Sequence, residues 1–304
     1  ANREIRQIRE INTGIMAAKR DRLDELLEML NCDNAQGEYL LTDIVAGARA
    51  KGLRVAGESI DDAGLASGVN NRAQLAELER IYQRRRADEL MVNGVTLADP
   101  MRFDMRGFLT VGEDSFIDIN CVFNGSNRIG KNVCIGPNCV ITDSTIADDV
   151  VIEANCVIES ADIAKRCAIG PFARMRPGTI MQEASKLGNF VETKNSEIGP
   201  GSKVNHLAYV GDSDVSESVN IGAGVITANY DGANKHRTHI EEGVFVGSNA
   251  VLVAPIRIGA GATVGAGSTV SRDVPENELV VARAKPRSVA NWQRPQKNKP
   301  KENK

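Results

Sequence analysis

The amino-acid sequence predicts a mainly β protein whose larger part is a left-handed parallel β-helix of hexapeptide repeats, preceded by a long helix and a partial α/β segment. Branched apolar residues recur at every sixth position near the C-terminal end, at Ile240, Val246, Leu252, Ile258, Val264 and Val270. Glycines follow several of them, and aromatic residues make up only 4% of the chain. Neither a helix nor an alternating strand repeats with period six, whereas each short strand of a hexapeptide β-helix sends one aliphatic side chain inward.

The same period extends over much of the chain, which disfavours a chance run inside an ordinary β-sandwich. From about Phe116 it includes, with occasional spacings of five, Ile117, Ile129, Ile135, Ile141, Ile146, Ile152, Ile158, Ile163, Ile169, Ile198, Val204, Val210, Val215 and Ile221. Two polar stretches, residues 172–194 and 227–239, interrupt the pattern. Insertions in solenoids collect on one face and often carry the binding site, so both stretches are candidates for it.

Residues 1–72 are expected to form the C-terminal remnant of an α/β domain. Apolar residues at helical spacing predict helices over Arg20–Leu30 and Tyr39–Ala50, and Leu53–Ala56 is a strand candidate. This segment has no Gly-rich loop, so it is interpreted as part of a larger domain.

A long helix is predicted over Arg72–Asn93, with residues 73–94 as a linker arm and Gly94 as its C-cap. Its basic face is interpreted as a solvated surface more readily than as a binding patch. The β-helix is expected over residues 95–283. Residues 284–304 are rich in Lys, Arg and Pro, which predicts a basic flexible tail that either helps to hold an anionic ligand or only solubilises the end.

The overall composition narrows the class of protein further. The formal net charge of −3 argues neither for nor against an anionic partner overall. No nucleic-acid partner is expected, and no apolar run is long enough to span a membrane. No signal peptide is recognisable and the six cysteines contain no CxxC pair, which predicts a cytoplasmic protein with small buried thiols rather than a disulfide framework.

Histidine is scarce, and His206 is the best candidate for chemistry. The chain has only three histidines, too widely spaced along the repeat to favour a zinc site. His206 comes two residues after the inward Val204, and an imidazole is the natural general base near neutral pH. The alternative is a structural histidine bonded to a neighbouring group.

Three cations lie at or beside the two interruptions: Arg176, Lys194 and Lys235. Each alone is more simply a surface charge. Their common position at the breaks in the repeat favours a site for a phosphate, which Arg176 can bind through two hydrogen bonds.

Several longer runs resemble one family. They are GPFARMRPG (170–178), GNFVETK (188–194), NHLAYVGD (205–212), NIGAGVITANYDGANK (220–235) and FVGSNAVLVAP (245–255), and upstream EINTGI (10–15), NAQGEYLLTD (34–43) and GVNNR (68–72). They are similar to the bacterial bifunctional N-acetylglucosamine-1-phosphate uridyltransferase/glucosamine-1-phosphate acetyltransferase. The resemblance covers essentially the whole chain except the tail.

The resemblance implies acetyl transfer from acetyl-CoA to the amine of glucosamine-1-phosphate, in a cytoplasmic homotrimer that serves UDP-N-acetylglucosamine biosynthesis for peptidoglycan and lipopolysaccharide. It implies that His206 is the catalytic base. The residues implied to bind the sugar phosphate are Arg176, Lys194, Tyr209, Asn220 and Lys235. Those implied to bind acetyl-CoA are Ala223, Asn229, Tyr230, Ser248, Ala266 and Arg283.

The uridyltransferase half of the family is only partly matched. Asn12 and Asn70 correspond to residues that bind the sugar nucleotide and Mg²⁺, but the glycine loop and the metal-binding aspartate have no counterpart in residues 1–304. Because one asparagine cannot hold Mg²⁺ without carboxylates, this activity is expected to be absent. Two other functions stay open: a hexapeptide acyltransferase with a different acceptor, and a non-catalytic β-helix that acts as a trimerisation or regulatory scaffold.

Overall fold

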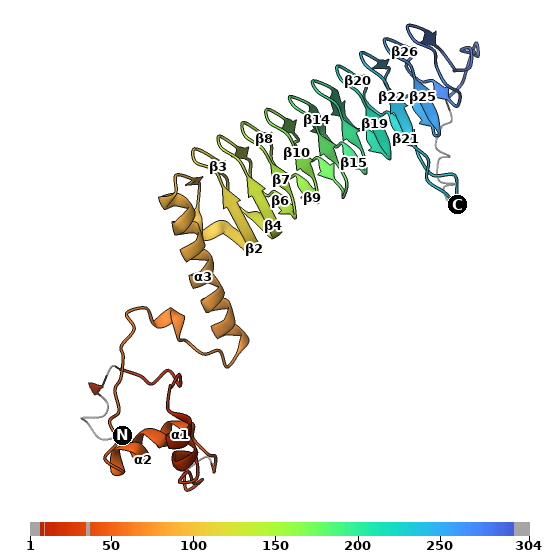
Figure 1. Cartoon of the computed structure of the whole chain (residues 1–304). Helices are drawn as coiled ribbons and strands as arrows, with labels where there is room; N and C mark the ends of the chain where they lie inside the picture. Colours follow the sequence, from red (N-terminus) through yellow and green to blue (C-terminus); the bar gives the residue numbers. More distant parts are fainter. Residues whose placement is uncertain (1–6, 9, 35–36, 295–304) are drawn as a thin grey trace, which may run out of the picture. The chain divides into compact units, whose positions relative to one another are not determined.

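The computed structural model describes residues 7–8, 10–34 and 37–294, and its chain divides into two compact units, residues 1–82 and 83–304 (Figure 1). The segment 295–304, the C-terminal part of the predicted basic tail, lies outside the described residues. Within the described part, no helix is both long and apolar enough to cross a membrane.

The first unit is helical where it is regular. It contains α1 (Arg20–Leu27), a 3₁₀ turn (Leu41–Asp43), α2 (Ile44–Ala50), a second 3₁₀ turn (Ala63–Leu65) and the start of α3 (Arg72–Val92). Its small core consists of Leu26, Ile44 and Ala48, with Leu23, Leu30 and Leu53 packed against them.

Two predictions for this unit need correction. The segment Leu53–Ala56 is not a strand, because none of the described residues of this unit offers it a strand partner. The helix predicted over Tyr39–Ala50 is regular only from Ile44, since the preceding turn is 3₁₀. The long helix was predicted correctly to within one residue, and Gly94 follows it with the positive φ of a C-cap.

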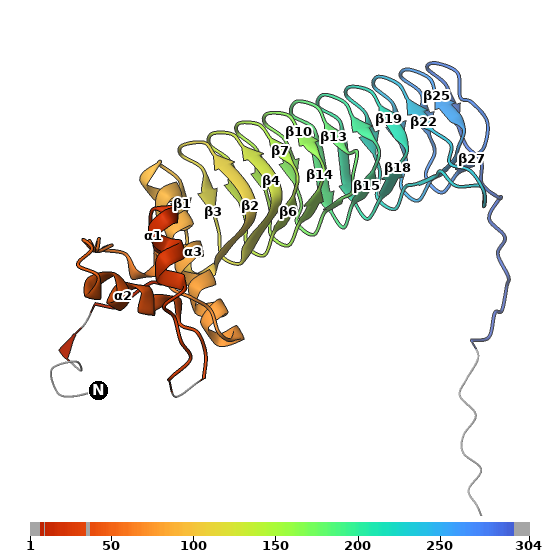
Figure 2. The same ribbon diagram turned by 60° about the horizontal axis from the view of Figure 1, so that its bottom comes forward.

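The second unit is a parallel β-solenoid with three faces, which confirms the predicted β-helix of hexapeptide repeats (Figures 1 and 2). Face 1 is a ladder of β1 (Thr96–Leu97), β3 (Phe116–Ile117), β5 (Cys134–Ile135), β8 (Val151–Ile152), β11 (Ala168–Ile169), β14 (Lys186–Asn189), β17 (Lys203–His206), β20 (Asn220–Ile221), β23 (Phe245–Val246), β26 (Thr263–Val264) and β28 (Leu279–Val280).

The other two faces start from two long strands, β2 (Phe103–Val111) and β4 (Cys121–Ile129), which pair along their whole length. Face 2 continues with β6 (Val140–Thr142), β9 (Val157–Glu159), β12 (Arg174–Met175), β15 (Glu192–Lys194), β18 (Tyr209–Gly211), β21 (Ile226–Ala228), β24 (Val251–Val253) and β27 (Thr269–Val270). Face 3 continues with β7 (Thr145–Ile146), β10 (Asp162–Ile163), β13 (Ile180–Met181), β16 (Glu197–Ile198), β19 (Ser213–Val215), β22 (Thr238–Ile240) and β25 (Ile256–Ile258).

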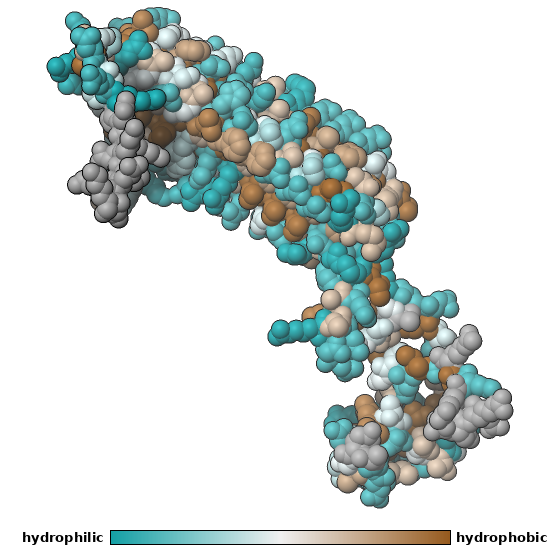
Figure 3. All heavy atoms as spheres, turned by 180° about the vertical axis from the view of Figure 1, so that it is seen from behind, coloured by the Kyte–Doolittle hydropathy of each residue, from teal (hydrophilic) through white to brown (hydrophobic). Residues whose placement is uncertain are grey.

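The six-residue period reflects the inward side chains of these faces. All six of the residues that define the period, Ile240, Val246, Leu252, Ile258, Val264 and Val270, are at most 4% exposed. Four cysteines are buried in the same core, as predicted, but Cys32 and Cys134 are exposed. On the outer surface of the solenoid, apolar residues alternate with polar ones (Figure 3).

The repeat starts earlier than Phe116, and one end of its core is closed. β1 already pairs with β3 in register, so the first coil begins near Thr96. Ala87 of α3 is fully buried against the core, and the Gln83 side chain exchanges two hydrogen bonds with the backbone of Met105. Such a cap is expected at the terminal repeat of a solenoid.

Only one of the two predicted interruptions exists. Residues 172–194 form regular coils, and the prediction failed because the buried positions that continue the six-residue period hold Met175, Met181, Leu187 and Thr193 instead of Ile or Val. The second interruption is real but shorter. Paired positions in neighbouring coils are mostly 17 or 18 residues apart in the sequence. Asn220, however, pairs with Phe245, which comes 25 residues later, because residues 229–237 form a loop that leaves the solenoid between β21 and β22.

Candidate active site

His206 lies on the outside of the solenoid, at the corner where face 1 ends. It is the last residue of β17, and the next residue, Leu207, makes the corner with a φ of 53°. The exposed imidazole places Nδ1 2.5 Å from Oδ1 of Asn189, which occupies the same register position one coil earlier. Because an amide oxygen can only accept, Nδ1 carries the proton and Nε2 is left with a lone pair.

The corner below His206 is a column of small residues. The backbone carbonyl of His206 accepts a hydrogen bond from the amide of Gly224 at 3.2 Å. The carbonyl of Ala223 accepts one from the amide of Asn249 at 2.7 Å, and the carbonyl of Ser248 accepts one from the amide of Gly267 at 2.9 Å. Nη1 of Arg283 ends the column with a 2.5 Å hydrogen bond to the carbonyl of Ala266. The structure thus aligns four of the six predicted acetyl-CoA residues, Ala223, Ser248, Ala266 and Arg283, along the edge that starts at His206.

The three predicted phosphate cations gather at the opposite end of face 2. Arg176 follows β12 and bonds Glu192 at 3.0 Å, and Lys194 is the last residue of β15. Lys235, from the loop 229–237, lies so close that its ammonium group lowers the pKa of Lys194 below the ordinary value, and Arg176 acts in the same direction. Two neighbouring ammonium groups indicate a receptor for a strong anion.

Tyr209 lies between the two ends of face 2. It is half-buried on β18, and its ring covers Gly211, where an added Cβ would meet the phenol oxygen at 2.4 Å. The outer surface of face 2 in these coils therefore has an imidazole at one end, a phenol in the middle and paired ammonium groups at the other end.

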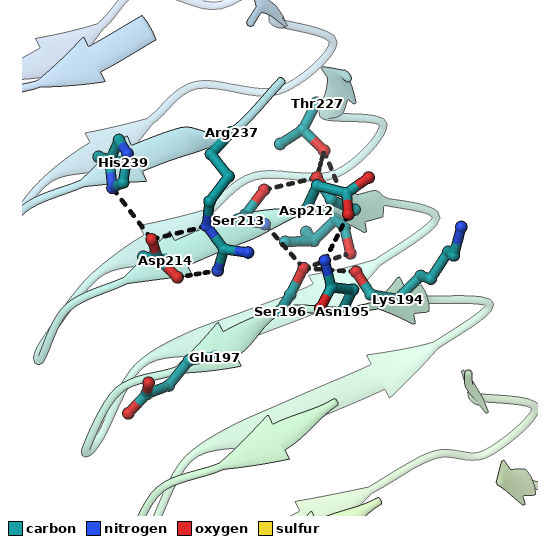
Figure 4. A network of polar contacts seen from close by, with 12 residues as sticks. Lys194, Asn195, Ser196, Glu197, Asp212, Ser213, Asp214, Thr227, Arg237 and His239 are labelled. Carbon is teal, nitrogen blue, oxygen red and sulfur yellow. Dashed lines mark hydrogen bonds and ion pairs between the residues drawn. The ribbon is translucent and has the colours of Figure 1, made fainter. Parts of the chain in front are cut away.

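Asp212 makes the corner after face 2 and joins three segments of the chain (Figure 4). It is 5% exposed and accepts hydrogen bonds from the side-chain amides of Asn195 at 2.6 Å and Asn229 at 2.5 Å. Burial alone would raise the pKa of Asp212, but these hydrogen bonds and the charges of Lys194 and Lys235 bring it below its usual value. The carboxylate is therefore ionised at neutral pH.

The loop 229–237 is held together by its own polar contacts. Asp231 accepts from the backbone amides of Ala233 and Asn234 and lies 2.7 Å from Nε2 of His236, and these contacts lower the pKa of its carboxyl group. The Tyr230 hydroxyl donates to the Gly232 carbonyl at 2.6 Å. The loop is thus held in one conformation by contacts among its own residues, in addition to its connections to β21 and β22.

At the end of this loop, two residues contact face 3. Arg237 forms an ion pair through both Nε and Nη2 with Asp214, which also lies 3.0 Å from Nδ1 of His239 (Figure 4). Each of the three histidines of the chain thus contacts a different partner. The three imidazoles do not converge on one point, as the sequence had led us to expect.

Asn220, Asn12 and Asn70 do not join the residues of face 2. Asn220 starts a strand of face 1, in register with Lys203. In the first unit, Asn12 accepts from the amide of Gly14, and the backbone amide of Asn70 donates to Gln74. No group of three or more His, Cys, Asp or Glu residues suited to a metal occurs among the described residues, so the residues present do not fit a Mg²⁺ site.

Sequence reasoning missed three residues: Asn189, which bonds His206; Glu192, which pairs with Arg176; and Asp212. The feature of the sequence that could have found Asn189 and Asp212 is the number of residues in one coil. Asn189 and His206, like Asn195 and Asp212, are 17 residues apart, the most common spacing of paired positions in this part of the chain. Aligning the sequence on that spacing would have brought these side chains together.

The fold and its repeats define a hexapeptide-repeat solenoid of the transferase type. The family described as bacterial transferase hexapeptide (six repeats) matches residues 237–272, and that described as GMPPB C-terminal domain matches residues 105–205. Within this class, the chain is similar over most of its length to proteins described as bifunctional protein GlmU.

Two curated relatives illustrate this similarity. The chain is 54% identical over 297 residues to the bifunctional protein GlmU of Marinobacter nauticus, covering 98% of this chain and 65% of the relative. It is 55% identical over 299 residues to that of Idiomarina loihiensis, covering 98% of this chain and 66% of the relative. The chain therefore spans slightly less than two thirds of the length of these proteins.

A solved structure with the same kind of coil is the acetyltransferase domain of PglB from Neisseria gonorrhoeae, in complex with acetyl coenzyme A. It is 25% identical, has a TM-score of 0.34, and the likeness covers 38% of this chain and 53% of that one.

Proposed function

We propose that the chain transfers the acetyl group of acetyl-CoA to the amine of glucosamine-1-phosphate, giving N-acetylglucosamine-1-phosphate for UDP-N-acetylglucosamine biosynthesis. The observation that carries this proposal is the arrangement on face 2, where an oriented imidazole and a pair of ammonium groups flank Tyr209. An amino sugar phosphate presents complementary groups, an amine that must lose a proton and a dianion that needs cations. A non-catalytic scaffold would need neither.

In the proposed reaction, Nε2 of His206 takes a proton from the substrate ammonium group as its nitrogen attacks the thioester carbon. The carbon–nitrogen bond forms and the carbon–sulfur bond breaks. The nitrogen gives its second proton to solvent, and the proton held by His206 passes to the departing thiolate. Arg176, Lys194 and Lys235 bind the phosphate, and Tyr209 contacts the sugar. Fixing both reactants in this way replaces a bimolecular encounter by an intramolecular one. The corner column Ala223–Ser248–Ala266, with Arg283, Asn229 and Tyr230, is proposed to bind acetyl-CoA.

The activity is tested by the release of free thiol from acetyl-CoA with glucosamine-1-phosphate as the acceptor. We expect turnover with this acceptor and much less with glucosamine, which lacks the phosphate. Turnover of another amine or hydroxyl acceptor alone would favour a different acyltransferase, and no turnover with any acceptor would favour the scaffold.

We also propose that the active form is a homotrimer. Asn220 starts β20 on face 1, in register with Lys203 and thus at the end of that face opposite to His206, so it can contribute to a site on face 2 only from a neighbouring copy. Light scattering is expected to give three times the mass of the 32.7 kDa chain. A monomeric mass at full activity would contradict this assembly.

For the first unit, we propose that residues 1–72 correspond to the C-terminal part of a uridyltransferase domain and that the 304-residue chain does not convert UTP. Asn12 and Asn70 are the two matching residues, and both are exposed without converging carboxylates. Incubation with UTP, N-acetylglucosamine-1-phosphate and Mg²⁺ is expected to yield no UDP-N-acetylglucosamine. Detection of that product would refute the proposal.

The pH dependence of anion binding gives a further prediction. An anion binds most tightly while Lys194 is protonated. The affinity of the site for an anion is therefore highest at pH values below the pKa of Lys194 and decreases as the pH rises through that pKa. Because Lys235 lowers that pKa, the loss begins at a lower pH than for an isolated lysine. Calorimetric titration with inorganic phosphate from neutral to alkaline pH measures this onset. In Lys235→Gln the remaining affinity is expected to persist to higher pH, and an unchanged onset would contradict the coupling.

A further inference from the structure

Asp212 is buried beneath the proposed phosphate cations, yet nothing in the proposed reaction uses it. Oδ1 of its carboxylate accepts from Nδ2 of Asn195 (Figure 4). Oδ2 accepts from Nδ2 of Asn229. Its backbone amide donates to the carbonyl of Lys194, and its carbonyl accepts from the amide of Thr238. One residue thus joins the coil of Lys194 to the loop that carries Lys235.

The ionised carboxylate determines how the Asn229 amide is turned. A carboxylate can only accept hydrogen bonds, so Asn229 must point Nδ2 at Asp212 and its Oδ1 elsewhere. Asn229 is 8% exposed, and its Oδ1 accepts no hydrogen bond from any residue that the structure describes. Nδ2 of Asn229 also lies 3.5 Å from the Tyr209 hydroxyl, and Asp212 feels the charges of Lys194 and Lys235. An acceptor held on this residue suits a ligand with an N–H or O–H donor near its phosphate.

We propose that Asp212 is a positioning residue that fixes Oδ1 of Asn229 as an acceptor, so that the site selects an amino sugar phosphate over a bare phosphate. The inference rests on the proposed function for the identity of this ligand. Its geometric part, the orientation of the amide by the carboxylate, depends only on the contacts of Asp212.

A purely electrostatic role for Asp212 makes the opposite prediction. The carboxylate is a negative charge near two ammonium groups, so removing it would strengthen the binding of every anion, sugar phosphate included. If Asp212 positions Asn229, its removal weakens the binding of the amino sugar phosphate and spares or strengthens that of inorganic phosphate.

The test compares Asp212→Leu, which removes both acceptors and keeps the branch at Cγ, with the double variant Asp212→Asn/Asn195→Asp. In the double variant, the amide introduced at position 212 can donate to the carboxylate introduced at position 195 and accept from Asn229. The net charge and the orientation of Asn229 are therefore both kept. Calorimetry gives Kd for glucosamine-1-phosphate and for inorganic phosphate, and thiol release gives kcat and KM.

We expect Asp212→Leu to raise Kd for glucosamine-1-phosphate roughly 10–100-fold, as for the loss of a buried hydrogen bond, with Kd for inorganic phosphate unchanged or lower. The double variant is expected to return close to the wild-type values. Glu241→Gln is the matched control, because the Glu241 carboxylate also accepts a hydrogen bond, here from the backbone amide of Ala260, but it follows β22 of face 3 and pairs with Arg257. It should leave both constants unchanged.

The proposal is overturned if Asp212→Leu binds the sugar phosphate normally, if it loses both ligands in parallel, or if the double variant fails as badly as the single one. A wild-type chain that binds glucosamine-1-phosphate without turnover would refute the proposed function while leaving the Asp212 comparison valid. Binding of neither ligand by the wild type would refute both.

Discussion

Replacing His206 by alanine is expected to lower kcat for acetyl transfer by roughly 10²–10⁴-fold, the usual contribution of a well-placed general base. The substrate amine is an ammonium ion at neutral pH and cannot attack a thioester until it loses a proton. Nε2 of His206 is available for this step because Nδ1 is already committed to Oδ1 of Asn189 at 2.5 Å. KM for glucosamine-1-phosphate should change little, since the phosphate is bound by other residues.

His239→Ala is the control for this experiment. His239 is also exposed, but it lies on face 3 and contacts Asp214 at 3.0 Å. Its rate is expected to match that of the wild type. Equal rates for His206→Ala and the wild type would remove His206 from the role of base, and a large loss in His239→Ala would mean that face 3 contributes to the chemistry.

The second large effect concerns stability. Met181→Ala is expected to reduce the free energy of unfolding by about 2–5 kcal/mol, because Met181 is 1% exposed and its loss leaves a cavity between stacked coils. The preceding residue, Ile180, lies on the same strand but points outward and is 40% exposed, so Ile180→Ala is expected to cost less than about 1 kcal/mol.

Urea denaturation followed by circular dichroism in the far ultraviolet measures both variants. The pair is informative because both residues are large and apolar, and hydropathy alone would not rank them. Similar losses in the two variants would mean that residues 172–194 are not a regular part of the coil.

The inward residues of the fold were easier to predict from the sequence than the geometry of the site, for physical reasons. The inward residues were predictable because a narrow interior requires an aliphatic side chain at a fixed period, as at Ile152, Ile258 and Val264. Where methionine or a hydroxyl residue replaces the branched aliphatic, as at Met181 and Thr193, the interior is still filled but the period is hidden.

The site was predicted as separate residues rather than as a geometry. His206, Lys194 and Lys235 could be singled out by their chemistry and by their neighbouring motifs. Asn189 and Asp212 could not, because an amide or a carboxylate is common on any surface and gains its meaning only from the side chain one coil away. The corner conformations were hidden as well, since Leu207 adopts a positive φ that an apolar residue seldom takes.

The 25-residue step between Asn220 and Phe245 bears on how this site can change in evolution or by design. The extra residues depart after one strand and return at the start of the next, and the hydrogen-bonded rungs on either side keep their alignment. Residues could therefore be added to or removed from the middle of the loop 229–237 without shifting the pairing of the other strands. Ligand preference could then be changed by the length of this loop, while the strands on either side keep their pairing.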